Sequence, residues 1–157
     1  MAITVGQPAP ELALFDSQKN KVTLSGLKGS NVLLLFYPQA FTGVCTKELC
    51  SVRDNIAQYN NVNATVLGIS VDSVFTLAKF KEEQQLNFPL LSDFNKEAIT
   101  AYDCAYDSFT DMGMKGVAKR SAFVIDREGI VRYAEVLGNA GDLPNFEAIN
   151  ATLDGLK

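Results

Sequence analysis

Two predominantly apolar runs constrain the fold of this chain more than any other feature. Residues 31–37 read NVLLLFY, and residues 64–71 read ATVLGISV. A strand with one face in water alternates apolar and polar residues, so a continuous apolar run predicts a strand buried on both faces. Between the two runs, apolar residues recur at helical spacing at Cys45, Leu49, Val52, Ile56 and Tyr59. Strand, helix and strand in this order predict a parallel core covered by helices.

The rest of the chain adds further expected elements. We expect an N-terminal hairpin (12–15 and 22–24), helices over 74–84 and 97–102, a short strand over 89–92, a hairpin (122–126 and 130–136) and a last helix over 144–156 that starts at Pro144. The order starts as βαβ and ends as ββα. It predicts an α/β fold of the thioredoxin-like plan, with a central mixed sheet flanked by helices and an N-terminal β-hairpin extension. No repeat or linker interrupts the chain, so we expect residues 1–157 to form a single domain.

Charge and hydropathy argue against two classes of partner. The formal net charge is −4, whereas nucleic acids and anionic membranes select basic surfaces. The longest apolar run is too short to span a bilayer. The N-terminus shows no basic and apolar segments typical of a signal peptide, so we expect a cytoplasmic protein in a reducing compartment.

The chain contains no histidine. This excludes Ser-His-Asp and Cys-His catalytic sites, as well as zinc sites built from histidine. Three cysteines are too few for a disulfide framework or an all-cysteine zinc site, so we expect no metal. A reactive thiol in this chain needs helix N-terminal amides or a cationic side chain to stabilise its thiolate.

Cys45 lies where such stabilisation is expected. It follows the first buried strand, in the first turn of the expected helix, on the stripe that faces the sheet. Unpaired backbone amides and the helix dipole favour an anion at that position. The hydroxyl of Thr42, three residues upstream, can cap the helix or donate to a ligand oxygen. A buried cysteine that acts as a small hydrophobe is the alternative interpretation.

Several motifs resemble those of peroxiredoxins. Pro38, Thr42 and Cys45 match the pattern P-x-x-x-T-x-x-C, and Glu48 follows at the position usual in that family. The stretch AKRSAFVID places Arg120 directly before a strand, like the conserved arginine of the family. FTGVCTKELC is similar to the bacterioferritin comigratory (Q-type) group, whereas PLLSDFN and the length resemble the E-type alkyl hydroperoxide reductases.

The resemblance implies a thiol-dependent peroxidase that needs no cofactor. Its substrates would be hydrogen peroxide and organic hydroperoxides, and its peroxidatic cysteine would become a sulfenic acid. It implies roles for Cys45 as nucleophile, Arg120 and Thr42 as hydrogen-bond donors, Glu48 as the residue that orients Arg120, Pro38 as a shield from water, and Val44 and Phe41 as substrate contacts. The chain has four arginines, and the choice of Arg120 depends on the resemblance alone.

Cys50 carries a geometric constraint. An intact helix separates the Cα atoms of Cys45 and Cys50 by roughly 7.5 Å along its axis, whereas a disulfide requires about 7 Å or less. If Cys50 is the resolving cysteine, as in many Q-type members, the first turns must unwind after the sulfenic acid forms. We expect this, with thioredoxin or a similar dithiol as reductant. A one-cysteine enzyme recycled by an external thiol is the alternative, and the resemblance permits a monomer or a homodimer.

Other interpretations stay open at this point. A thiol-disulfide oxidoreductase would require C-x-x-C, a metal-binding module would require more ligands, and a peroxide sensor would use the same Cys45 chemistry. Cys104 is expected to be a partly buried thiol at a helix end. Residues 108–119 depart most from the family pattern. We expect a surface loop there, and a segment that lines the pocket or forms a dimer contact is the alternative.

Overall fold

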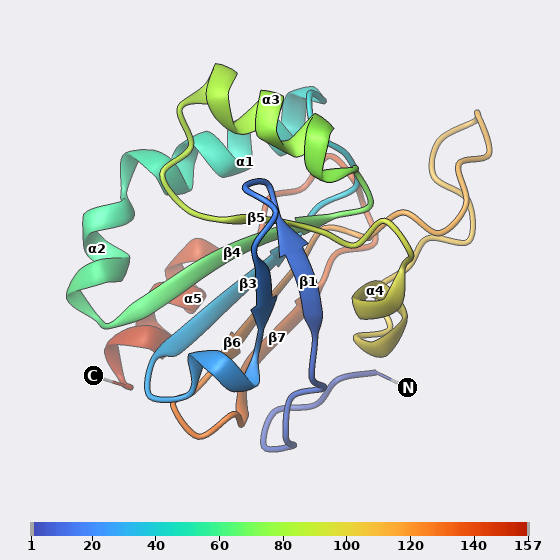
Figure 1. Ribbon diagram of the computed structural model, residues 1–157. Helices are drawn as coiled ribbons and strands as arrows, with labels where there is room; N and C mark the ends of the chain where they lie inside the picture. The colour runs from blue at the N-terminus through green and yellow to red at the C-terminus, as the bar shows by residue number, and fades with distance from the viewer. Residues whose placement is uncertain (1, 157) are drawn as a thin grey trace.

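The computed structural model describes residues 2–156 and contains one mixed sheet (Figure 1). Its strands lie in the order β2-β1-β5-β4-β3-β6-β7. Their bounds are β1 Ala13–Asp16, β2 Lys21–Thr23, β3 Asn31–Phe36, β4 Ala64–Ser70, β5 Leu90–Ser92, β6 Ser121–Ile125 and β7 Val131–Val136. Every residue of β3 is buried, as its continuous apolar sequence predicts.

The centre of the sheet is parallel and its two edges are antiparallel. β3 pairs with β4 in parallel, with Leu34 opposite Leu67, and β4 pairs with β5 in the same sense. β6 and β7 continue the sheet in antiparallel sense on one side, and the β1–β2 hairpin does so on the other. The mixed thioredoxin-like sheet and the N-terminal hairpin are thereby confirmed.

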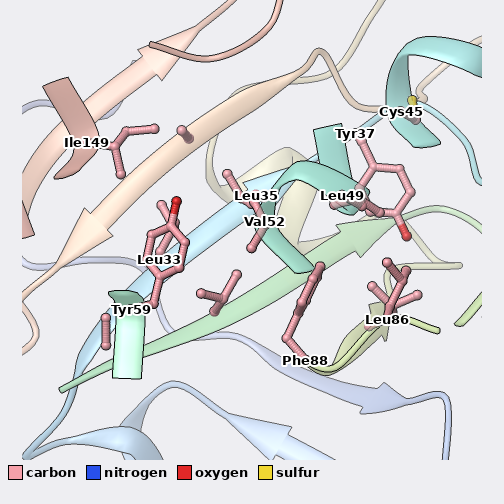
Figure 2. Packing of buried hydrophobic residues seen from close by; sticks show 14 of the residues in the cluster. Leu33, Leu35, Tyr37, Cys45, Leu49, Val52, Tyr59, Leu86, Phe88 and Ile149 are labelled. Carbon is pink, nitrogen blue, oxygen red and sulfur yellow. The ribbon is translucent and has the colours of Figure 1, made fainter. Parts of the chain in front are cut away.

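Helices cover the two faces unequally. Their bounds are α1 Gly43–Asp54, α2 Ile56–Asn61, α3 Val74–Gln84, α4 Glu97–Ala101 and α5 Phe146–Asp154, with a short 3-10 helix at Ser25–Leu27. Residues of α1, α2, α3 and α5 pack with alternate residues of β3 in one core cluster, part of which Figure 2 shows. The other alternate residues of β3 pack in a second cluster with α4 and the N-terminal segment.

The two largest differences from the expected helices are a break in the first helix and a later start of the last one. The apolar stripe predicts one helix from Cys45 to Tyr59, but the helix is interrupted at Asn55, whose side-chain amide donates to the Ser51 carbonyl at 2.8 Å. That carbonyl is the partner that the Asn55 backbone amide would have in a continuous helix, so the side chain competes with the backbone for it. The last helix starts at Phe146 and not at Pro144, because Asn145 caps it by accepting from the Ala148 amide at 3.1 Å.

The parallel strands direct several loops to one end of the sheet. The loop after β3 is held there by the loop after β4, because the Asp72 carboxylate accepts a hydrogen bond from the Ala40 amide at 2.8 Å. Phe41, the next residue, has a φ of 67°, which is uncommon for a side chain other than glycine. Carboxyl ends of parallel strands are where ligands bind in such sheets. Among the described residues, no helix is long and apolar enough to cross a membrane.

Candidate active site

Cys45 is the third residue of α1 and is 1 % exposed. The first hydrogen bond of the helix joins the amide of Thr46 to the Thr42 carbonyl at 2.9 Å. The amides of residues 43–45 come before it, in the turn where backbone amides have no partner within the helix. Figure 2 shows Cys45 at the end of α1 beside Tyr37, with Leu49 further along the helix. The sulfur is therefore buried at the positive end of a helix dipole, the end at which negative charge is stabilised.

Thr42 occupies the N-cap position of α1, but its side chain does not cap the helix. Its hydroxyl donates instead to the Gln39 carbonyl at 2.9 Å. The hydroxyl oxygen keeps its acceptor capacity, and the group can rotate to donate to another oxygen. The predicted capping hydrogen bond is thus absent, and Thr42 lies beside Cys45 with a polar group that a ligand can use.

Arg120 connects Cys45 to a buried carboxylate. It is the largest fully buried side chain of the described residues, and it lies directly before β6. Its Nη2 donates to Cys45 Sγ at 3.3 Å and to the Ala140 carbonyl at 3.3 Å, while its Nη1 donates to Glu48 Oε1 at 2.7 Å. One guanidinium thus contacts both groups that can be anionic here.

The electrostatics of this cluster follow from burial and pairing. Burial raises the pKa of Glu48 to about 7, although the guanidinium of Arg120 opposes this shift. Burial acts against the charged form of Arg120, but Glu48 and Cys45 together raise the pKa of the guanidinium. Arg120 therefore keeps its charge, and that charge lies within hydrogen-bond distance of the sulfur.

A hollow of about 250 Å³ opens at Cys45. Its lining residues are Thr42, Gly43, Val44, Cys45, Phe109, Arg120, Ala140 and Gly141. Glu48 is fully buried and does not line the hollow, but it accepts from Nη1 of the guanidinium whose Nη2 contacts the sulfur. The structure thus brings together five of the residues expected at the site, namely Thr42, Val44, Cys45, Glu48 and Arg120.

Two other expected residues lie outside this lining. Pro38 is buried and lies two residues after the end of β3. Phe41 is 48 % exposed, and its ring packs against Phe80 with 5.0 Å between the ring centroids. Both shape the loop that leads into α1, but neither lines the hollow.

Four lining residues were not among the predicted site residues. Gly43 lies between Thr42 and Val44, Phe109 comes from the segment that we expected to be a surface loop, and Ala140 and Gly141 follow β7. The Asn139-Ala-Gly stretch has the composition of a turn, but this composition does not indicate proximity to Cys45. Only the fold brings these segments to the carboxyl end of β3.

The remaining two cysteines differ in their surroundings. Cys50 is partly buried on α1, and its thiol contacts Gln84 Oε1 at 3.5 Å. Cys104 is fully buried, so the expectation of a partly buried thiol was wrong. All three cysteines are free thiols. Within residues 2–156, no group of three or more acidic, cysteine or histidine side chains is arranged to hold a metal ion.

Comparison with known proteins identifies the family of this chain. Residues 5–134 match the model of the AhpC/TSA family. Alkyl hydroperoxide reductase E of Mycobacterium tuberculosis is 41% identical over 135 residues, which cover 85% of this chain and 86% of that protein.

Solved structures agree with this match. The crystal structure of peroxidoxin BcpB from Mycobacterium tuberculosis has a TM-score of 0.87 and 31% identity and covers 99% of both chains. The bacterioferritin comigratory protein of Xanthomonas campestris has a TM-score of 0.80 and 27% identity, covering 92% of this chain and 90% of that one. The chain is therefore an enzyme of the peroxiredoxin class and belongs to the AhpC/TSA family.

Proposed function

We propose that this peroxiredoxin reduces hydrogen peroxide and organic hydroperoxides at Cys45, with Cys50 as the resolving cysteine and thioredoxin or a similar dithiol as the reductant. The observation that carries the proposal is the 3.3 Å contact between Arg120 Nη2 and Cys45 Sγ inside a hollow that opens at the helix N-terminus. A peroxide that enters this hollow meets the sulfur and a fixed cation together.

In the first step, the Cys45 thiolate attacks one peroxide oxygen. An S–O bond forms as the O–O bond breaks, and the leaving oxygen takes the peroxide proton to become water or an alcohol. The sulfenate left on Cys45 takes a proton from solvent to become the sulfenic acid. Negative charge moves from the sulfur along the S–O–O line, so donors fixed beside that line stabilise the transition state. Arg120 and the hydroxyl of Thr42 act as these donors, together with the backbone amides of Val44 and Cys45.

Glu48 acts through Arg120. Its 2.7 Å ion pair, with both side chains at most 2 % exposed, fixes the guanidinium so that Nη2 faces the sulfur. Pro38 keeps water from the loop before α1. Val44 supplies an apolar contact for the substrate, and Phe41 supports the same loop through its packing on Phe80.

In the second step, the Cys50 thiolate attacks the sulfenic acid sulfur. The S–S bond forms as the S–O bond breaks, and the leaving hydroxide takes a proton from solvent to become water. Both cysteines lie on the continuous helix α1, five residues apart, so this step requires the first turns of α1 to unwind. The C-terminal part of α1 is anchored to the end of α3, because Arg53 Nη1 donates to the Gln84 carbonyl at 2.6 Å. The N-terminal part therefore has to move toward Cys50.

Turnover with thioredoxin and its reductase tests the proposal in the wild type and in the C45S and C50S variants. We expect peroxide consumption by the wild type and background rates in C45S. Peptide mapping after peroxide treatment without reductant should find a Cys45–Cys50 disulfide. A stable Cys45 sulfenic acid with no such disulfide would contradict the role of Cys50 and leave a one-cysteine enzyme.

We further propose that residues 1–157 form a single-domain enzyme. It works as a monomer or a homodimer in a reducing compartment such as the cytoplasm. Gel filtration coupled to light scattering, with the protein reduced and then oxidised, measures the assembly directly. A mass above that of a dimer in either state would contradict it.

A further inference from the structure

One wall of the Cys45 hollow comes from a segment outside the sheet. Residues 105–118 form a small hairpin, in which the isolated bridges pair Ala105 with Ala118 and Phe109 with Met114. The amides of Phe109 and Met114 each donate to the other's carbonyl, at 2.7 and 3.2 Å. In Figure 1 this yellow-orange segment projects from the molecule beside α4.

Phe109 is the aromatic residue in the lining of the hollow. It is half-buried, and its ring packs against Tyr106 of the same hairpin, with 5.1 Å between the ring centroids. The second half of the hairpin is held by Lys96, whose Nζ donates to the Lys115 carbonyl at 2.9 Å. The ring therefore has a supported position opposite the residues of α1.

The chemistry of the hollow is divided between a polar and an apolar part. Thr42, Cys45 and Arg120 supply the polar groups, whereas Val44, Phe109 and Ala140 supply apolar side chains. Hydrogen peroxide uses only the polar groups. An organic hydroperoxide also brings an alkyl or aryl group, which gains free energy when it leaves water for an apolar wall.

We propose that Phe109 determines the preference of this enzyme for organic hydroperoxides over hydrogen peroxide, and that Tyr106 is a positioning residue that holds the Phe109 ring. This inference rests on the proposed peroxidase function of Cys45 and names the residues that select its substrate. Loss of the Phe109 ring removes the apolar contact with the organic group but leaves the contacts to the two peroxide oxygens. The two substrates should therefore respond differently to the same substitution.

The test compares kcat/KM for cumene hydroperoxide and for hydrogen peroxide in matched variants. In Phe109→Ala we expect about a tenfold loss for cumene hydroperoxide, the size of selectivity that hydrophobic pockets provide, and a change within about twofold for hydrogen peroxide. Phe109→Leu should lose about two- to threefold for cumene hydroperoxide only.

Control substitutions distinguish an effect of the Phe109 ring from the effect of any change in the hairpin, and from the effect of removing any exposed apolar side chain. Met112 lies at the tip of the same hairpin and is 78 % exposed, and Phe75 is 70 % exposed on α3. Met112→Ala and Phe75→Ala should leave both rates unchanged. Tyr106→Ala should reproduce a weaker form of the selective loss, and Tyr106→Phe, which keeps the ring, should not.

Failure of this inference and failure of the proposed function give different results. Equal losses for both substrates in Phe109→Ala, or no loss for either, would overturn the inference while leaving the peroxidase intact. Undiminished turnover in C45S would instead overturn the proposed function itself. Unfolding curves for each variant identify a general loss of folding, and Phe109→Leu keeps the inference testable if Phe109→Ala is unstable.

Discussion

Two thiols in this protein are almost equally buried and have opposite electrostatic surroundings. Cys45 and Cys104 are 1 % and 0 % exposed, and they belong to the core clusters on opposite faces of the sheet. Cys45 has the Arg120 guanidinium 3.3 Å from its sulfur. For Cys104, burial raises the pKa of the thiol to about 12, and the carboxylates of Asp93 and Asp103 act in the same direction.

The comparison shows that burial alone does not make a cysteine reactive. The charges around a buried sulfur decide whether negative charge can develop on it. At Cys45 the positive neighbours are Arg120 and the start of α1. Cys104 follows the end of the short helix α4, so it lacks the helix N-terminus that Cys45 has.

The largest effect should come from removing the reactive thiol itself. We expect C45S to lower peroxide turnover to background, because serine offers no comparable nucleophile at neutral pH. C104A should keep wild-type turnover, because its thiol stays protonated and has no access to solvent. Steady-state assays with hydrogen peroxide measure both. Loss of turnover in C104A with its fold intact would contradict the conclusion that Cys45 is the reactive thiol and Cys104 is not.

The next effect concerns the cation that distinguishes the two thiols. We expect Arg120→Met to lower kcat/KM by about 10²–10³, the cost of removing a fixed donor from a charged transition state. It should also lower the free energy of unfolding by roughly 3–5 kcal/mol, because Glu48 is left buried without a counter-charge. Stopped-flow kinetics and urea unfolding measure the two losses separately.

A second variant separates stability from catalysis. In the double variant Arg120→Met with Glu48→Gln, no uncompensated charge is buried, so most of the stability should return while the peroxidase stays slow. Recovery of both stability and activity would show that Arg120 acts only as the partner of Glu48.

Glu48 should have a smaller effect that depends on pH. Burial raises its pKa in the folded protein from the ordinary 4.5 to about 7, so the folded state binds more protons than the unfolded state between these values. Its contribution to stability is fully present below about pH 4.5 and is lost as the pH rises through 7. The difference between wild type and Glu48→Gln should therefore fall over this window by on the order of 3 kcal/mol, since a tenfold change in ionisation is worth ~1.4 kcal/mol.

Urea unfolding at several pH values between 4.5 and 7.5 measures this difference. A difference that grows with pH would mean that the attraction of Arg120 outweighs burial. Glu48→Gln should also lower kcat/KM by roughly tenfold, since a hydrogen bond to a charged group contributes about 1.5–3 kcal/mol.

The smallest expected effect is structural. Cys104 packs in the second core cluster, and C104A should cost about 1–2 kcal/mol of stability through the small cavity it leaves. The thiol should also resist alkylation in the native protein at pH 8. Rapid native labelling of Cys104, timed by mass spectrometry, would be incompatible with its raised pKa and burial.

Much of the fold could be predicted because its signals are local. The expected helix over residues 74–84 matches α3, and Ser73 caps it by accepting from the Thr76 amide at 3.2 Å. The break at Asn55 was not predictable from periodicity, because the apolar stripe continues on both sides of it. It results from one side-chain hydrogen bond within the helix.

The residues of the site also fall into those that a local sequence pattern indicates and those that only the fold brings together. Cys45 and Thr42 lie in one local stretch that indicates a reactive thiol, whereas Arg120 was chosen among four arginines by resemblance alone. Phe109 and Ala140 reach the hollow only through long-range contacts between loops. No local pattern encodes such contacts, so these residues required the structure.

Trapping the sulfenic acid tests the central claim most directly. The C50S variant, which cannot form the proposed disulfide, is mixed with equimolar hydrogen peroxide and dimedone, and the adduct is located by peptide mapping. We predict one adduct on the peptide of Cys45 and none on that of Cys104. An adduct on Cys104, or oxidised protein with no adduct on Cys45, would contradict the account.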